Sequence, residues 1–435
     1  MVAERLSILY LTPLPPSPPG SGAQARMHGL LTSLAARHEI TAVSLIDPDL
    51  DPGPCERALR EHCREVVLLP CDTGLRDKRR LQLRSLLSSH SFERHRFAAR
   101  ALQETLDRLQ RSRRFDLVNL EFPYLGHLDL RKAPGGALRP ALVVDSHEIA
   151  YDLGRQMASG KARWPRRIYG GLNWRKLRAE ELATYRAADG IYTCSAADEQ
   201  RLLAEVPAAR TAVIPNAADV DFYRPAPSHP PADGRTVLFF GLLSTYPNAD
   251  GAQFLLREIW PRVLARRPEA RLKIVGADPP GWLGALAGPG VEVTGFVEDL
   301  RPHLAAAALV AVPLRLGGGT RLKIVEGMAM GKAIVSTALG AEGIDAVPGR
   351  DLLLADDPEA FADAVARLLV DAELARTLGE RARRLAVERY SWSAAAEALD
   401  RFLREIVSEG RSASPSPREA ALPSPRAAPG PEGES

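Results

Sequence analysis

The stretch Gly317–Glu326 has the residue types of an anion-binding site. It reads Gly-Gly-Gly-Thr-Arg-Leu-Lys-Ile-Val-Glu and follows the apolar run Leu309–Val312, so we expect a helix to begin within it. Glycines before a helix N-terminus expose backbone N–H groups, and the helix dipole attracts negative charge there. Arg321 and Lys323 add two cations in the expected first turn, where they disfavour the helix itself. This placement predicts an anionic ligand, with Glu326 able to accept hydrogen bonds from ribose hydroxyls; a solvated helix start is the alternative.

A second group of polar residues, Asp145-Ser146-His147-Glu148, follows the apolar run 141–144. We expect it to end a strand and to point into a ligand cleft. A histidine beside carboxylates can hydrogen-bond a sugar hydroxyl or act as a base. A loop histidine held by its neighbours is the other interpretation.

The segment Gly20–Ala25 matches G-x-G-x-x-A, the dinucleotide-binding fingerprint. In that fingerprint the first glycine follows the strand directly, whereas eight residues separate Gly20 from the apolar run that ends at Leu11. We therefore favour a substrate-facing loop at a helix N-terminus over a NAD site or a plain turn.

Two segments, 47–51 and 219–221, have the D-x-D spacing that can hold a divalent ion. Each follows an expected strand, where Asp and Pro are common turn formers, and we interpret both as turns. Four cysteines include no C-x-x-C pair, so we expect reduced thiols and no metal site.

Short apolar runs alternate with segments of helical periodicity in two successive stretches of the chain, which indicates parallel sheets covered by helices. The expected strands are 7–11, 40–45, 117–120, 141–144, 190–193 and 212–214, then 236–240, 272–275, 291–293, 309–312 and 333–336. We predict an α/β fold with two doubly wound, Rossmann-like domains, 1–224 and 235–390. The cleft between them, at the carboxyl ends of both sheets, is the expected ligand site. A last amphipathic helix is expected over 391–408, and the Pro- and Ser-rich segment 410–435 is expected to be disordered.

The length and the charge of the chain make some classes of protein less favoured than others. The chain has 435 residues, 57 basic and 54 acidic, and this net charge of +3 does not favour a nucleic-acid binder. No apolar run approaches the roughly 20 residues that span a bilayer, and we expect a cytoplasmic protein. Basic residues nevertheless gather in 76–100 and in 155–178, where aromatic residues are interleaved. These segments either dock on an anionic membrane surface or form solvated helix faces.

Taken in order, these motifs resemble the family 4 glycosyltransferases, which have the GT-B fold, and look similar to bacterial sugar transferases of exopolysaccharide clusters. The resemblance extends from Leu6 to about Leu403. It also includes residues 214–217, 220–225, 240–241, 275–276, 293–297, 329–331 and 390–392.

The resemblance implies transfer of a hexose from a nucleotide-diphosphate sugar to a glycan or lipid-linked acceptor, with retention, without a metal or other cofactor, in cell-surface polysaccharide synthesis. The first domain would bind the acceptor, the second the donor, and the last helix would return to the first domain. Glu326 would hold the ribose, Phe296 and Val297 would lie by the base, and His147 would contact the transferred sugar. The loop ending at Gly22 would approach the diphosphate. The further residues assigned to substrate binding are Gly20, Asp145, Asn216, Gly241, Gly317, Gly318, Gly319 and Thr320.

Two departures from the family pattern bear on the site. Many members have a glutamate eight residues before the ribose glutamate, where this chain has Gly318, and many have an Arg and a Lys in the segment equivalent to 241–248, which has neither. We expect Arg321 and Lys323 to supply the missing positive charge on the leaving diphosphate. A sugar-nucleotide epimerase or phosphorylase on a similar scaffold, and a non-catalytic nucleotide-binding protein, are the alternative functions.

Overall fold

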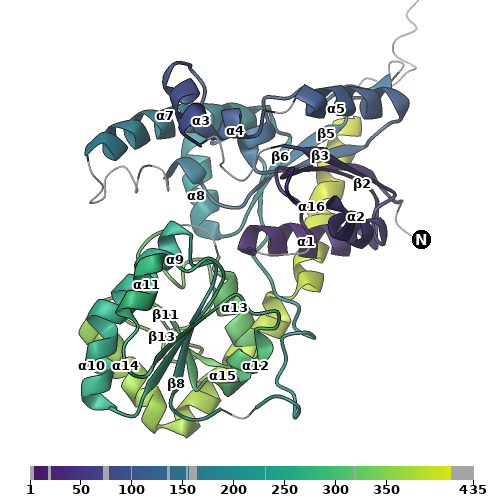
Figure 1. The fold of residues 1–435 in the computed structure, drawn as a ribbon. Coiled ribbons are helices and arrows are strands. Elements are labelled where there is room, and N and C mark those ends of the chain that lie inside the picture. The colour runs from purple at the N-terminus through teal and green to yellow at the C-terminus, as the bar shows by residue number, and fades with distance from the viewer. Residues whose placement is uncertain are drawn as a thin grey trace, which may run out of the picture.

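The computed structural model describes residues 4–17, 21–71, 78–98, 100–134, 138–152, 155, 164–230, 232–317 and 320–412. They form two parallel sheets, each with helices on both faces, one above the other in Figure 1. The predicted α/β class with two doubly wound halves is confirmed. Among these residues no helix is both long enough and apolar enough to cross a membrane.

The first sheet has seven parallel strands in the order β3-β2-β1-β4-β5-β6-β7. They are β1 (Ser7–Thr12), β2 (Glu39–Ile46), β3 (Glu65–Pro70), β4 (Leu117–Glu121), β5 (Ala141–Ser146), β6 (Gly190–Thr193) and β7 (Thr211–Val213). The strand order reverses between β1 and β4, and such a switch point opens a crevice for ligands at the carboxyl ends of the strands.

Helices cover both faces of this sheet. One face packs on α1 (Gly22–Ala35), α2 (Pro52–Arg60) and α16 (Trp392–Ser412). The other packs on α5 (Arg100–Ser112), α7 (Trp164–Ala187) and α8 (Ala196–Glu205). The last helix therefore returns to the first half, as the resemblance implies.

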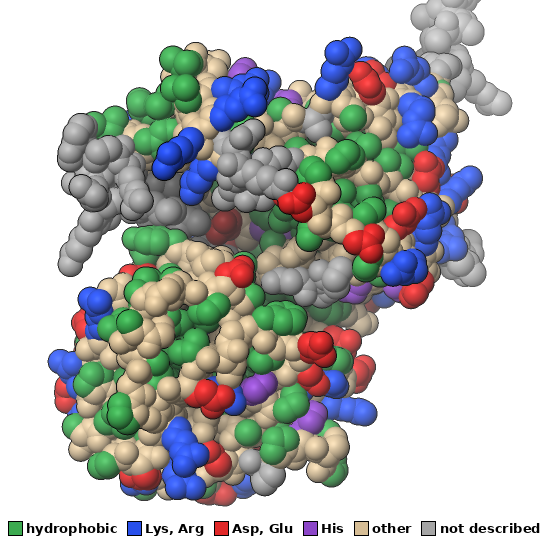
Figure 2. Space-filling model, viewed as in Figure 1, with side chains coloured by type: hydrophobic (Ala, Val, Ile, Leu, Met, Phe, Trp, Pro, Cys, Tyr) green, Lys and Arg blue, Asp and Glu red, His purple; other side chains and the backbone are tan. Residues whose placement is uncertain are grey.

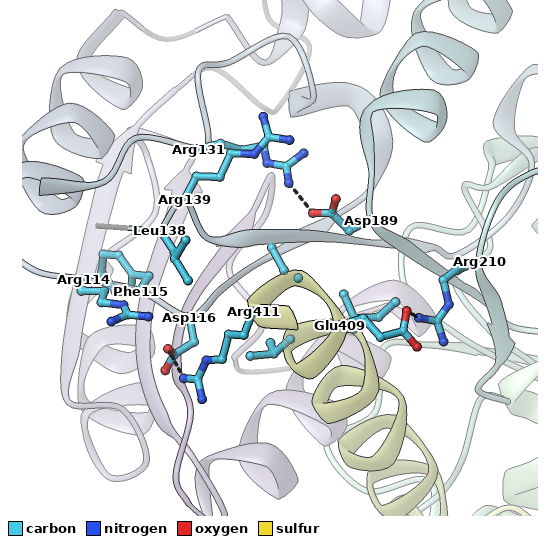
Figure 3. A pocket seen from close by; sticks show the side chains of 14 residues that line it. Arg114, Phe115, Asp116, Arg131, Leu138, Arg139, Asp189, Arg210, Glu409 and Arg411 are labelled. Carbon is cyan, nitrogen blue, oxygen red and sulfur yellow. Dashed lines mark hydrogen bonds and ion pairs between the residues drawn. The ribbon is translucent and has the colours of Figure 1, made fainter. Parts of the chain in front are cut away.

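The end of α16 corrects the predicted start of the disordered tail. Helix α16 continues through Ser412, and Arg411 near its end donates to Asp116, just before β4, at 2.7 Å. Residues 413–435 lie outside the described part. Asp116 and Arg411 line a cavity of about 440 Å³ at the amino edge of the first sheet, where Arg131 pairs with Asp189 and Arg210 with Glu409 (Figure 3).

A separate helical layer lies over α7, formed by α3 (Lys78–Leu86) and α4 (Phe92–Arg96) (Figure 1). The hydroxyls of Ser85 and Tyr169 lie 2.9 Å apart, and Lys176 donates to the Ser88 carbonyl at 2.7 Å. The two basic segments that the sequence singled out are thus packed against each other.

The second sheet has six parallel strands in the order β10-β9-β8-β11-β12-β13, with its switch point between β8 and β11. The strands are β8 (Thr236–Phe240), β9 (Arg271–Val275), β10 (Val291–Gly295), β11 (Leu309–Val312), β12 (Ala333–Ser336) and β13 (Leu353–Leu354). The helices are α9 (Tyr246–Phe254), a π-helical turn (Leu255–Ile259), α10 (Trp260–Arg266), α11 (Gly281–Leu286), α12 (Arg301–Ala306), α13 (Leu322–Ala329), α14 (Pro358–Val370) and α15 (Ala372–Arg389).

Candidate active site

The carboxyl ends of the two sheets face each other, and Figure 2 shows the hollow between the upper and the lower half. The side chain of Thr320, which follows β11, donates to the carbonyl of Cys194, which follows β6, at 2.6 Å. On the same side of the molecule Arg201 of α8 pairs with Glu342 of the second half at 2.6 Å. The two halves are therefore in direct contact beside the expected ligand site.

A buried ion pair forms the floor of the first half. Arg26 of α1 donates to both carboxylate oxygens of Asp145, at 2.8 and 3.0 Å. Arg26 also donates to the carbonyl of Ile214 at 2.9 Å. Burial raises the pKa of Asp145 to about 6, and Arg26 opposes this shift. The expectation that Asp145 points into the cleft is wrong, because β5 continues through Ser146 and Asp145 is fully buried beneath Arg26.

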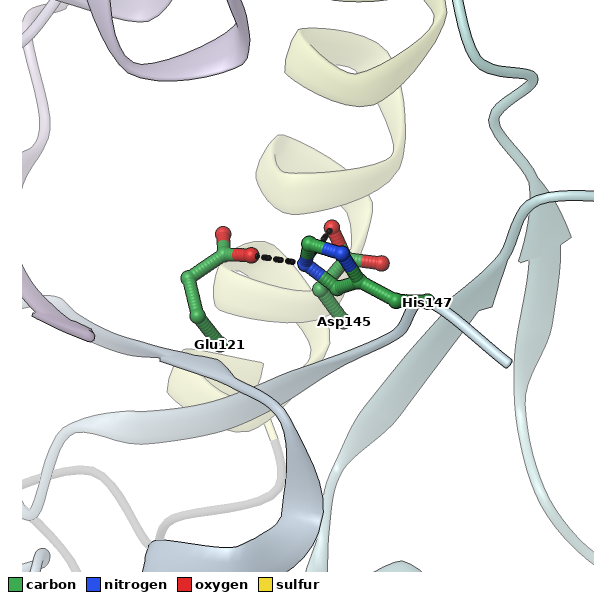
Figure 4. Close-up of side chains that lie close together, drawn as sticks. All are labelled: Glu121, Asp145 and His147. Atoms are coloured by element: carbon green, nitrogen blue, oxygen red, sulfur yellow. Dashed lines mark hydrogen bonds and ion pairs between the residues drawn. The ribbon is translucent and has the colours of Figure 1, made fainter. Parts of the chain in front are cut away.

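His147 lies directly after β5 and is held by Glu121, the last residue of β4. The distance from Nε2 of His147 to Oε2 of Glu121 is 2.6 Å (Figure 4). Burial lowers the pKa of His147 to about 4 and raises that of Glu121. A hydrogen bond at Nε2 fixes the ring orientation, and Nδ1 is the nitrogen that Glu121 does not contact.

Further buried polar side chains hydrogen-bond to Glu121. Tyr10 and Asn119 both donate to its Oε1, and Tyr192 donates to Asn119 at 3.0 Å. All of these groups are buried in the sheet. A fully hydrogen-bonded network of this kind rigidifies its members, so His147 sits on a fixed support.

Phe122 covers the imidazole of His147. Its ring stacks on that of His147 with 3.9 Å between centroids, and its backbone N–H donates to the Asp145 carbonyl at 3.1 Å. Phe122 has a φ of 64°, which is strained for a bulky residue. The fold thus retains an unfavourable backbone conformation that keeps an aromatic ring over the histidine.

Among the described residues, one group has side chains of the types that bind metal ions. It consists of Glu121, Asp145 and His147, and one possible ligand atom from each lies within 4.8 Å of the others. Both oxygens of Asp145 are engaged by Arg26, so the guanidinium supplies the positive charge of this cluster.

The turn interpretation of the two D-x-D segments is confirmed, since Asp47 and Asp219 each accept from a backbone N–H two residues on.

In the second half, α13 begins at Leu322, one residue later than the charge pattern implied. Arg321 is its N-cap and only Lys323 lies in the first turn, because the backbone of Arg321 is extended. Gly22, the first residue of α1, lies so near that a Cβ on it would be 3.3 Å from Cδ1 of Leu322. The first residues of α1 and α13 are therefore in contact, so the positive dipole ends of the two helices lie near each other.

Lys323 reaches from α13 to the loop after β8. Its ammonium donates to Oδ1 of Asn248 at 2.6 Å and lies over the ring of Phe239. A Cβ on Gly241, whose φ is 143°, would be 3.2 Å from this ammonium. Burial, followed by the charge of Arg321, lowers the pKa of Lys323 to about 7. A cation thus stands beside the loop 241–248, which has no Arg or Lys of its own.

Arg321 has a different environment from Lys323. A Cβ on Gly317 would be 3.1 Å from its Nη2, so the guanidinium packs on that glycine. Burial lowers the pKa of Arg321, and the charges of Glu148, Glu342 and Asp198 oppose this shift. The two expected cations therefore separate, with Arg321 among carboxylates of both halves and Lys323 at the β8 loop. Gly20, Gly318 and Gly319 lie outside the described residues.

Glu326 is hydrogen-bonded by Tyr223, which comes from the segment that leads out of the first half. Burial raises the pKa of Glu326 to about 7, while Tyr223 and then Lys323 act against this shift. Phe296 and Val297 follow β10, the outermost strand on that side; Phe296 is exposed and Val297 is half-buried. The structure thus brings Glu326, Lys323 and Gly241 together in the second half, and Phe296 and Val297 lie at the same carboxyl edge of its sheet.

Sequence reasoning missed the residues that hold the predicted ones in place. These are Tyr10, Arg26, Asn119, Glu121, Phe122, Tyr192, Tyr223 and Asn248. Two of them have a signal in the sequence: Arg26 lies beside Met27 on the apolar stripe of a helix, and Glu121 ends a buried apolar strand. A charge in either place is unfavourable unless it is paired or functional.

Two family models match the chain. The model described as Glycosyltransferase Family 4 matches residues 20–222, and the one described as Glycosyl transferases group 1 matches residues 234–371. Among curated proteins, the D-inositol 3-phosphate glycosyltransferase of Corynebacterium jeikeium (strain K411) is 29% identical over 222 residues, 46% of this chain and 52% of that protein. The chain thus aligns with about half the length of this relative.

Solved structures with a similar fold cover nearly the whole chain. Sucrose-phosphate synthase from Thermosynechococcus elongatus has a TM-score of 0.68 at 20% identity, over 93% of this chain and 100% of that one. HepE of Anabaena, in complex with UDP-glucose, has a TM-score of 0.64 at 18% identity, over 92% of this chain and 100% of that one. WaaG, a glycosyltransferase involved in lipopolysaccharide biosynthesis, has a TM-score of 0.61 at 15% identity, over 90% of this chain and 98% of that one. These likenesses establish a GT-B fold. Because the two family models match the halves on either side of the linker, the chain belongs to the glycosyltransferases that they describe.

Proposed function

We propose that this protein transfers a hexose from a nucleoside-diphosphate sugar to a hydroxyl of a glycan or lipid-linked acceptor, with retention of the anomeric configuration, in the synthesis of a cell-surface polysaccharide. One observation carries the proposal. Two helix N-termini and the ammonium of Lys323 meet at the switch point of the second sheet, on the side that faces the first half. Such a place suits a diphosphate.

The donor would bind with its ribose at Glu326, its base by Phe296 and Val297, and its diphosphate against Lys323 and the start of α13. The bond from the sugar to the diphosphate breaks, and the negative charge that develops on the leaving oxygen is stabilised by Lys323, Arg321 and backbone N–H groups. The acceptor hydroxyl forms the new bond from the same face and gives its proton to the departing phosphate oxygen. Nδ1 of His147 would contact a hydroxyl of the transferred sugar.

The test is release of nucleoside diphosphate from a panel of UDP-, GDP- and ADP-sugars, with and without acceptor extracts. We expect transfer only with an acceptor, and a product with the donor's anomeric configuration by NMR. Conversion of the donor into another nucleotide sugar without an acceptor and without release of nucleoside diphosphate, read by NMR, would instead indicate an epimerase. Turnover that requires phosphate would indicate a phosphorylase, and no turnover with any combination would indicate a binding protein.

Lys323→Met is the informative variant, with Lys332→Met as its control. Burial also lowers the pKa of Lys332, to about 8. The ammonium of Lys332, however, donates to the backbone carbonyls of Ala305 and Ala307. We expect Lys323→Met to lose transfer by about 100-fold, and Lys332→Met to retain it. Equal losses would contradict the role of Lys323.

We further propose that the surface formed by α3 and α7 docks on an anionic membrane, where a lipid-linked acceptor lies, so that the protein is cytoplasmic and peripheral. Leu83, Leu86 and Leu87 on or beside α3 and Ile168 and Leu172 on α7 are all exposed, and Leu87 is 81% exposed. The exposed basic residues of this surface include Lys78, Arg79, Arg80, Arg84 and Arg175. Figure 2 shows hydrophobic and basic side chains together in this upper part. Apolar residues ringed by Lys and Arg suit the surface of an anionic bilayer.

Flotation with phosphatidylglycerol vesicles tests the docking separately from the chemistry. We expect binding at low salt, none to phosphatidylcholine vesicles, and loss of binding in Leu83→Ser/Leu87→Ser. Val370→Ser, which removes an exposed apolar residue of the second half, is the control. No binding of the unaltered protein would remove the docking proposal and leave the transferase proposal in place.

A further inference from the structure

The side-chain amide of Asn216 is engaged by protein at both ends. Its Oδ1 accepts from Nη1 of Arg26 at 3.0 Å, within the first half. Its Nδ2 donates to the backbone carbonyl of Thr320 at 2.6 Å, in the second half. A side chain held by the protein at both ends of its amide has a fixed orientation and joins the two halves.

Thr320 is attached to the first half a second time. Its hydroxyl donates to the carbonyl of Cys194 at 2.6 Å, and Thr320 is buried. Thr320 belongs to the loop between β11 and α13, of which residues 313–317 and 320–321 are described. Two hydrogen bonds from two separate segments of the first half thus end on one residue of this loop.

This loop leads directly into the anion site. Arg321 follows Thr320 as the N-cap of α13, and Lys323 lies two residues further on. The position of the loop therefore sets where the first N–H groups of α13 and both cations stand. Errors of about 1 Å in such a site cost around 100-fold in rate, so whatever fixes the loop contributes to the chemistry.

The same hydrogen bonds continue to the other side of the cleft. Arg26, which holds Asn216, also holds Asp145 at 2.8 Å, and Asp145 lies 3.4 Å from Nε2 of His147. A continuous series of side chains thus joins the surroundings of His147 to the loop at the anion site.

We infer that Asn216 is a positioning residue, which fixes the β11–α13 loop against the first half and so sets the anion site relative to His147. It acts through Thr320 and does not contact the substrate. This inference rests on the proposed function for its catalytic consequence, but the attachment itself is a property of the ligand-free protein.

Asn216→Asp is the decisive variant because it separates the two ends of the amide. The carboxylate still accepts from Arg26, so a role confined to the first half is preserved. Its second oxygen replaces the donor to Thr320 and faces a carbonyl oxygen instead, which breaks the attachment. Asn216→Ala removes both bonds.

Hydrogen exchange of the ligand-free protein gives the first readout. We expect backbone amides in the segment 320–325 to exchange about tenfold faster in Asn216→Asp, with exchange in β5 and α1 unchanged. Unaltered exchange in 320–325, or equal changes throughout the first half, would overturn the inference. This measurement decides the attachment even if the protein transfers no sugar.

Binding and rate give the second readout. Calorimetry with UDP, GDP and ADP should show a Kd about tenfold weaker in Asn216→Asp for the nucleotide that binds, and kcat should fall while the KM for acceptor is retained. A changed acceptor KM with an unchanged Kd for nucleotide would assign Asn216 to the acceptor instead.

Should Asn216→Asp fail to fold, Thr320 supplies an independent pair of variants. Thr320→Val removes the hydroxyl that donates to Cys194 and keeps the shape of the side chain, while Thr320→Ser keeps the hydroxyl. We expect faster exchange in 320–325 for Thr320→Val, and exchange rates restored in Thr320→Ser. Identical exchange in these two variants would contradict the inference.

Discussion

Gly343 and Ser195 meet where the two halves touch. A Cβ on Gly343 would lie 2.6 Å from the Cβ of Ser195 and 3.1 Å from Oγ1 of Thr320. Only a glycine permits this approach, and its φ of 79° is also a conformation that favours glycine. The close contact of the halves thus depends on the absence of one side chain.

Gly343→Ala should therefore separate the halves. Its control is Gly349→Ala, with a φ of 77° and nothing within 4 Å of the added Cβ. Both variants should lose about 1–2 kcal/mol of stability from backbone strain, by urea unfolding. Only Gly343→Ala should increase the radius of gyration in solution scattering and weaken nucleotide binding. Equal scattering for the two variants would show that the contact tolerates a methyl group.

Nucleotide binding should take up a proton at pH 8. With a pKa of about 7, Lys323 is mostly neutral there in the ligand-free protein, and a diphosphate beside it favours the charged form and raises the pKa. Affinity should accordingly fall as the pH rises from 7 to 9. Calorimetry in Tris and in HEPES, whose ionisation enthalpies differ, measures the proton directly. An uptake that persists in Lys323→Met would assign the proton to another group.

Arg321→Ala should reduce transfer by about 100-fold while the fold stays intact, because the variant loses positive charge beside the leaving group. Arg315→Ala is the control, since Arg315 pairs with Asp250 on the surface of the same half at 2.9 Å. Initial rates and circular dichroism check both variants. Full activity of Arg321→Ala would leave Lys323 as the cation that stabilises the diphosphate.

Arg26→Met should destabilise the protein by about 3–5 kcal/mol, because it leaves Asp145 buried and unpaired. Adding Asp145→Asn should restore part of this loss, since no charge then remains buried. Arg37→Met, which breaks a pair with the partly exposed Asp400, should cost less than about 1 kcal/mol. Urea unfolding measures all of them, and strictly additive losses would show that Arg26 and Asp145 do not interact.

The centre of each sheet was predictable because its strands are continuous apolar runs. The strands 236–240, 309–312 and 333–336 have the predicted bounds. The edge strands β3 and β13 were not predicted. β13 has only 2 residues, too few for a recognisable pattern, whereas β3 contains the apolar run Val66–Leu69, which does indicate a strand.

The positions of the main site residues were predictable from sequence motifs, but the side-chain contacts that hold them were not. His147, Lys323 and Glu326 lie at the carboxyl ends of the sheets as expected. Their supports come from distant positions, with Arg26 119 residues before Asp145, and sequence periodicity carries no information on such pairs. The separate surroundings of Arg321 and Lys323 depend on a helix that begins one residue later than the charges suggest.

The return of α16 to the first half has a consequence for synthesis on the ribosome. Residues of α16 from Ala395 to Val407 complete one of the two cores of the first sheet, while the core of the second half lies within 218–390. The half that is translated first therefore leaves one apolar face uncovered until the last helix emerges. We expect the second half to fold before the first is complete, the reverse of the usual N-terminal-first order.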